Sequence, residues 1–151
     1  MKKVKHRKAI MISLIILVIV IAIPLGLYVG GNYYFSDARI FEGNWNIVFP
    51  TNIKETYSKN KPTDFQGHGS RYAVFQMKSS NAAFLSDSSN EKNSEMEKTV
   101  SKILNDIGVN QNEYPVFSNS YRWKIISKYT YKLYVVYDNK SSLLYLIQDM
   151  P

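Results

Sequence analysis

The longest apolar run of the chain extends from Ala9 to Val29 and contains no charged residue. One Ser, one Gly, one Pro and a Tyr near its end are its only interruptions. As a helix rising about 1.5 Å per residue, a run of this length spans about 30 Å, the thickness of a bilayer's hydrocarbon core. The pattern therefore predicts a transmembrane signal-anchor helix over residues 9–29.

Beyond this run, the polar and apolar positions predict a small α+β domain over residues 43–151. Short aromatic and β-branched runs bounded by turn residues are typical of strands. Together with one helix they give the order ββαβββ, a mainly antiparallel sheet with one packed helix. The predicted strands are Asn44–Phe49, Tyr72–Met77, Tyr121–Ser127, Tyr131–Tyr137 and Leu143–Gln148. The last two do not alternate cleanly, so we expect both faces of the sheet to be partly covered.

The clearest helix is predicted over Ser94–Ile107, where apolar residues recur at helical spacing along a single face. Ser94 and Glu97 match a capping box, and Gly108 suits a helix end. A shorter stretch, Thr51–Lys61, is polar with Ile53 and Tyr57 four residues apart, which predicts one or two helical turns.

Three segments are predicted to be turns or loops. Gly67 and Gly69 flank His68, as in a tight hairpin turn that requires positive φ. Asn81–Asn93 is rich in Ser, Asn and Asp, which is typical of a loop. Asp138–Ser141 lies between two strands and is predicted to be a hairpin loop.

The charge pattern predicts the orientation of the apolar helix. Residues 1–8 form a basic tag without an acidic residue, and such a tag stays on the cytoplasmic side of a membrane. We therefore expect a single-pass protein of the cell membrane, with residues 30–42 as a juxtamembrane linker and the domain outside. The basic residues of the tag are Lys2, Lys3, Lys5, Arg7 and Lys8.

A cleaved signal peptide is the alternative interpretation, because its basic and apolar regions look similar. The apolar run is longer than those of most signal peptides, and no small-x-small cleavage site follows Pro24. Both features favour an uncleaved anchor.

The net charge of +7 is mainly a topology signal. Five of the 19 basic residues lie in the tag, so the rest of the chain has 14 basic and 12 acidic residues, close to neutral. Without a dense basic stripe in the domain, nucleic acid is not an expected partner. The chain has no cysteine, so no disulfide framework or cysteine metal site is expected. This layout and composition resemble those of small single-pass exported proteins of Gram-positive bacteria.

The candidate chemistry is sparse. His68 is the only histidine outside the tag, and Asp64, Ser70 and Arg71 lie near it in the sequence. Neighbours in one tight turn rarely point at one reacting atom, so an exposed turn histidine is favoured over a catalytic one. No calcium-loop or phosphate-binding spacing is present, and no metal or cofactor is expected.

Tyrosines in the last strands form a second candidate site. Tyr129, Tyr131 and Tyr134, with Lys128 and Lys132, would form a binding face if they lay together, because Tyr is common in contact surfaces. The simpler interpretation is that they are ordinary strand residues. His68 and Arg71 complete the candidate binding residues.

The sequence thus favours a non-catalytic, membrane-anchored binding or accessory module outside the cell, with an envelope protein or a wall polymer as its partner. One alternative is an envelope hydrolase centred on His68. Another is a small regulatory or immunity-type subunit that associates through its transmembrane helix, where Gly26 and Gly30 form a small-xxx-small pair.

Overall fold

The computed structural model describes residues 2–34, 36–51, 53–62, 69–77 and 82–150. The chain forms two compact units, Met1–Arg39 and Ile40–Pro151. The first contains the 33-residue helix α1, Lys2–Tyr34, in which the side chains of residues 13–28 are exposed. Over the described part of the chain, no helix combines the length and the apolarity needed to cross a bilayer.

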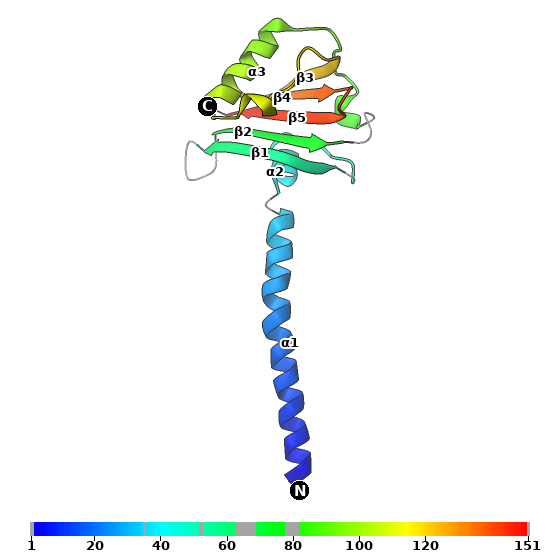
Figure 1. Ribbon diagram of the computed structural model, residues 1–151, viewed down its shortest axis with the longest axis vertical. Helices are drawn as coiled ribbons and strands as arrows, with labels where there is room; N and C mark the ends of the chain where they lie inside the picture. The colour runs from blue at the N-terminus through cyan, green and yellow to red at the C-terminus, as the bar shows by residue number, and fades with distance from the viewer. Residues whose placement is uncertain (1, 35, 52, 63–68, 78–81, 151) are drawn as a thin grey trace. The chain divides into compact units, whose positions relative to one another are not determined.

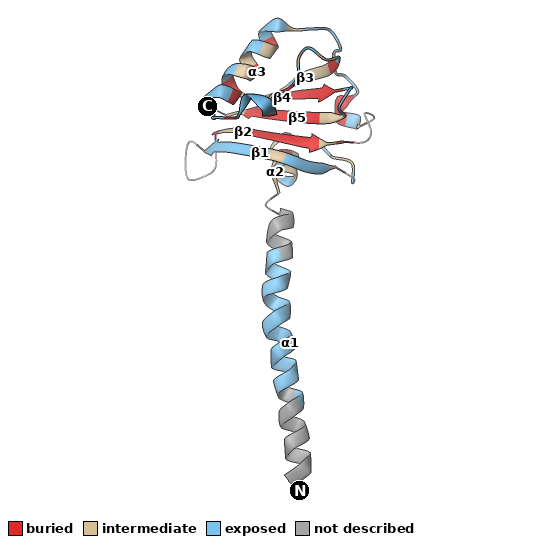
Figure 2. Ribbon diagram, in the orientation of Figure 1, coloured by how far each residue is buried: buried red, intermediate tan, exposed pale blue. Residues whose placement is uncertain are grey.

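The second unit is built on one antiparallel sheet of five strands in the order β1-β2-β5-β4-β3 (Figure 1). This arrangement confirms the predicted α+β class. The last strand in the sequence, β5, is the central strand of the sheet, and its neighbours β2 and β4 are also largely buried (Figure 2). The strands are β1 (Lys54–Pro62), β2 (Gly69–Gln76), β3 (Tyr121–Lys128), β4 (Tyr131–Asp138) and β5 (Leu143–Asp149).

Helix α3, Ser94–Asp106, covers one face of this sheet. Its apolar side packs on alternate residues of the strands, because successive strand side chains point to opposite faces. This packing confirms the predicted helix and its apolar face. The core on this side includes Met96, Val100, Ile103, Leu104 and Ile107 from the helix region and Tyr72, Val74, Tyr134, Val136, Tyr145 and Ile147 from the strands.

The opposite face is covered by helix α2, Asp37–Trp45, and by the short 3-10 helix Ala83–Leu85. Phe41 is fully buried, although the sequence suggested that residues 30–42 were a linker. The second compact unit accordingly starts at Ile40, slightly before the predicted boundary at residue 43. The Phe49 ring contacts those of Phe75 and Phe84, at centroid distances of 5.4 and 5.5 Å.

The strand predicted at Asn44–Phe49 is wrong. Trp45 is the last residue of α2, and Asn46 adopts a positive φ of 52° that ends the helix. Phe41 and Trp45 are four residues apart and both buried, a short helical pattern that the aromatic run beyond it concealed. The first strand of the ββαβββ order is instead β1.

The helical turns predicted at Thr51–Lys61 are also wrong, because β1 occupies most of this segment. Nearly all of its side chains are exposed, and Tyr57 alone packs against the core beneath α3. Hydrogen bonding to β2 along the whole strand, rather than an internal apolar pattern, makes this segment a strand.

Residue Asn93, not Ser94, caps α3. The Asn93 side chain accepts a hydrogen bond from the amide of Met96 at 2.9 Å. Glu97 instead accepts from the hydroxyl of Tyr121 at 2.5 Å, so the predicted capping box does not form. The predicted helix end is confirmed, since Gly108 follows with a φ of 74°. The strands predicted near β2, β3, β4 and β5 are confirmed to within three residues at each end.

One buried polar residue links α2 to the sheet. Gln148 of β5 is 1% exposed, and its side-chain oxygen accepts hydrogen bonds from Trp45 Nε1 at 2.8 Å and Asn44 Nδ2 at 3.2 Å. Its amide nitrogen donates to the backbone oxygen of Gly69 at 3.4 Å. A buried amide with partners on both sides fixes where α2 sits along the strands.

We expect Gln148→Leu to lower the free energy of unfolding by roughly 1–3 kcal/mol, because it leaves the buried Trp45 N–H without an acceptor. The double variant Trp45→Phe/Gln148→Leu should lose less stability than the sum of the losses in the two single variants, because it removes both partners of the hydrogen bond. Urea unfolding followed by circular dichroism measures both. Strict additivity would contradict the coupling.

Candidate functional site

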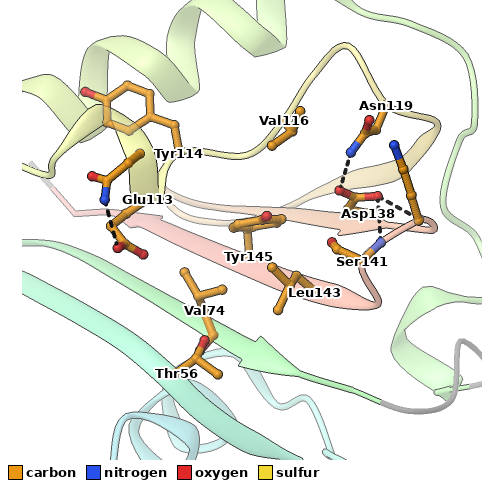
Figure 3. Close-up of a pocket in the computed structure, with 12 residues that line it drawn as sticks. Thr56, Val74, Glu113, Tyr114, Val116, Asn119, Asp138, Ser141, Leu143 and Tyr145 are labelled. Atoms are coloured by element: carbon orange, nitrogen blue, oxygen red, sulfur yellow. Dashed lines mark hydrogen bonds between the residues drawn. The ribbon is translucent and has the colours of Figure 1, made fainter.

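A pocket of about 580 Å³ opens on the α3 face of the sheet, beside the part that the helix covers (Figure 3). Its floor is apolar, and its walls carry amides, carboxylates and hydroxyls. We call it the Tyr145 pocket, after the residue in the middle of Figure 3. The lining residues are Thr56, Val74, Asn112, Glu113, Tyr114, Val116, Asn119, Asp138, Lys140, Ser141, Leu143 and Tyr145.

The wall above the floor is the segment 112–119, which follows α3 and precedes β3. It is tied to the sheet by the Tyr72 hydroxyl, which donates to the backbone oxygen of Glu113. On the other side, a β-bulge in β1 makes Thr56 an extra residue between Glu55 and Tyr57. The Thr56 hydroxyl donates to the backbone oxygen of Val74 at 3.1 Å, which holds it at the pocket.

The β4–β5 turn closes the pocket and is organised by Asp138, which is 2% exposed. One of its carboxylate oxygens accepts from the amides of Lys140 and Ser141 at 2.7 and 3.3 Å, and the other from Asn119 Nδ2 at 2.8 Å (Figure 3). The predicted hairpin loop at 138–141 is thereby confirmed, with its carboxylate joined to the wall segment.

Three titratable groups in and beside the pocket, Asp138, Tyr145 and Tyr72, have shifted pKa values. Burial opposes ionisation of Asp138, but the hydrogen bonds from Asn119, Lys140 and Ser141 outweigh it and lower the pKa of this carboxyl. Burial, and then the charge of Asp138, raise the pKa of Tyr145. Burial likewise raises the pKa of Tyr72. The pocket therefore offers an ionised carboxylate whose oxygens are occupied and a tyrosine that remains protonated.

Two of the candidate tyrosines lie at a second pocket, of about 250 Å³, on the α2 face. We call it the Tyr129 pocket. Tyr129 occupies the β3–β4 turn and is 92% exposed, whereas Tyr131 is half-buried. The lining residues are Gly43, Asn44, Trp45, Lys128, Tyr129, Tyr131 and Met150.

The other candidates lie elsewhere. Tyr134 is 5% exposed and points to the opposite face, where with Lys132 it lines a pocket of about 240 Å³ next to α3. The three tyrosines therefore do not share one face. Arg71 lies on β2, opposite Gln148 in the register with β5. His68 lies outside the described residues.

Sequence reasoning did not find the Tyr145 pocket. The sequence predicts the 138–141 turn and the strands that hold Val74 and Tyr145, but only as elements of the fold. Thr56, Glu113 and Tyr114 carry no local pattern, because a bulge and an irregular segment bring them together. Among the residues that the structure describes, no group of three or more His, Cys, Asp or Glu side chains is placed to hold a metal ion.

No known family model matches the chain, and neither the curated proteins nor the solved structures include a match to it.

We expect the contribution of Asp138 to stability to depend on pH. The pKa of Asp138 is lower in the folded protein than its unfolded value of about 4, so the ionised carboxylate stabilises the fold above about pH 4. This stabilisation is lost as the pH falls through the pKa of the folded state. At pH 7, Asp138→Asn should cost roughly 1–3 kcal/mol. The difference between the urea midpoints of the two proteins should shrink as the pH falls below about 4. A difference that stays constant with pH would refute this role.

Proposed function

We propose that the protein is a membrane-anchored extracytoplasmic binding module that takes its ligand in the Tyr145 pocket. The ligand belongs to an envelope protein or a wall polymer. The observation that carries the proposal is the pocket itself, about 580 Å³ with an apolar floor and hydrogen-bonding walls. Small-molecule and peptide sites have this size and this mixture of surfaces.

The anchor is supported by the sequence of residues 9–29 and by the side chains of α1. Bulky apolar residues between Met11 and Tyr28 are 49% to 72% exposed. A row of exposed apolar residues of this length is unfavourable in water and is expected in lipid. The basic residues of the tag favour a cytoplasmic N-terminus, which places the domain outside.

A binding role, rather than acid–base catalysis, is supported by the chemistry of the lining. The oxygens of Asp138 already accept hydrogen bonds from Asn119 and the turn amides. Tyr145 has a raised pKa and remains a hydrogen-bond donor. Such groups orient a ligand, whereas a general acid or base needs a pKa near the working pH.

To test the pocket, we would replace Val116 with Trp. Val116 lines the pocket and is 49% exposed, so a larger side chain there fills the mouth without disturbing the core. We expect in-cell crosslinking and co-purification of the full chain to recover about tenfold less of the partner, equivalent to ~1.4 kcal/mol of binding free energy.

The matched control is Val48→Trp, the same change at a residue that is 77% exposed and does not line the pocket. It should leave recovery unchanged. Equal recovery with both variants would exclude this pocket as the binding site.

The orientation is testable because the chain has no cysteine. Ser58→Cys, on the exposed strand β1, should react with a membrane-impermeant maleimide on intact cells. Lys3→Cys, in the basic tag, should react only after the cells are permeabilised. The reverse pattern would refute the proposed topology.

A further inference from the structure

The β3–β4 turn carries a residue that its conformation does not favour. Tyr129 has a φ of 58°, in the left-handed region that tight hairpin turns require and that Asn and Gly adopt most easily. Its side chain is 92% exposed, so it gains almost nothing from packing within the domain. An aromatic residue that is strained and also unburied points to a contact made outside the domain.

The Tyr129 pocket beside this turn combines aromatic and basic groups. Tyr129, Tyr131, Trp45 and Met150 contribute apolar surface, and Lys128 contributes a positive charge. None of the lining residues that the structure describes carries a carboxylate side chain. The nearby Glu42 accepts a hydrogen bond from the amide of Phe49 at 3.0 Å. Tyr and Lys together are the residues that occupy the headgroup level of a bilayer.

The pocket also includes residues that are close in the sequence to the start of the domain. Gly43, Asn44 and Trp45 belong to α2 and come shortly after Ile40, and residues 30–42 separate them from the predicted anchor. A segment of that length reaches at most about 45 Å when fully extended. If residues 9–29 are the anchor, these residues cannot leave the neighbourhood of the bilayer, and the high effective concentration makes even a weak surface contact significant.

We propose that the Tyr129 pocket and the β3–β4 turn dock on the outer surface of the bilayer, with the Tyr129 ring among the headgroups and Lys128 beside anionic lipids. This inference rests on the proposed membrane anchor. The chemistry of the turn supports the proposal. The amphipathic Tyr129 ring is stabilised at the interface between headgroups and acyl chains, and Lys128 is attracted to the negative charge of anionic lipids. The binding site of the Tyr145 pocket lies on the other face of the sheet and is left open to solvent.

The test uses the full chain in lipid nanodiscs with a nitroxide label at Thr130→Cys. Thr130 is exposed and adjacent to Tyr129, so the label reports on the turn and leaves the tyrosine in place. In discs rich in phosphatidylglycerol, we expect its collisions with a water-soluble nickel complex to be at least about threefold fewer than in phosphatidylcholine discs. A label at Ser58→Cys, on β1, should remain equally accessible in both.

Tyr129→Ser should restore the accessibility of the label at residue 130 in phosphatidylglycerol discs. The matched control, Ile125→Ser, changes an exposed apolar residue that lies outside both the Tyr129 and the Tyr145 pockets, and it should leave the accessibility of the label unchanged.

Two failures are distinguishable. A full chain that does not co-elute with the discs would overturn the anchor and the docking together. If the chain co-elutes with the discs but the label at residue 130 is as accessible as the label at residue 58 in both lipids, the docking alone is overturned.

Discussion

The fold depends on one constraint: the central strand β5 is apolar toward both faces of the sheet. Leu144 and Leu146 are fully buried on one face, and Tyr145 and Ile147 are buried on the other. A strand of this kind is stable only between two covering layers, which α3 and α2 provide. Gln148 lies on the same face as Leu144 and Leu146. Its side-chain amide binds Asn44 and Trp45 at one place along α2, and these hydrogen bonds fix the position of the helix on the sheet.

The Tyr145 pocket follows from unequal cover on the α3 side. No residue of α3 lines the pocket, and the irregular segment 112–119 lies over this part of the sheet instead. That segment is held near its ends by Tyr72 and Asp138, and between them Tyr114 and Phe117 pack against the core. The pocket is the space that remains between this segment and the sheet. The same residues that complete the fold therefore form the walls of the proposed site.

Local patterns were sufficient to predict α3 and the central strands, because these elements bury a periodic apolar surface. They failed for β1 and α2. The strand β1 is held by its neighbour and has one residue, Tyr57, packed on the core, so no period marks it. The helix α2 has two buried residues, Phe41 and Trp45, too few to outweigh the strand-like run that follows. Tyr131 and Tyr134 show a similar limit, because a spacing of three residues in a strand directs side chains to opposite faces.

The two outer strands of the sheet, β1 and β3, are protected from pairing with another chain in different ways. Trp123 of β3 exchanges backbone hydrogen bonds of 2.8 Å with Ser89, so part of that edge is already paired. The strand β1 carries the exposed residues Lys54 and Lys59. If the β1 edges of two copies paired, these lysines would lie near the lysines of the other copy. Repulsion between like charges and the bulge in β1 make this pairing unfavourable. The sheet is therefore protected against edge-to-edge aggregation when newly made chains are crowded together.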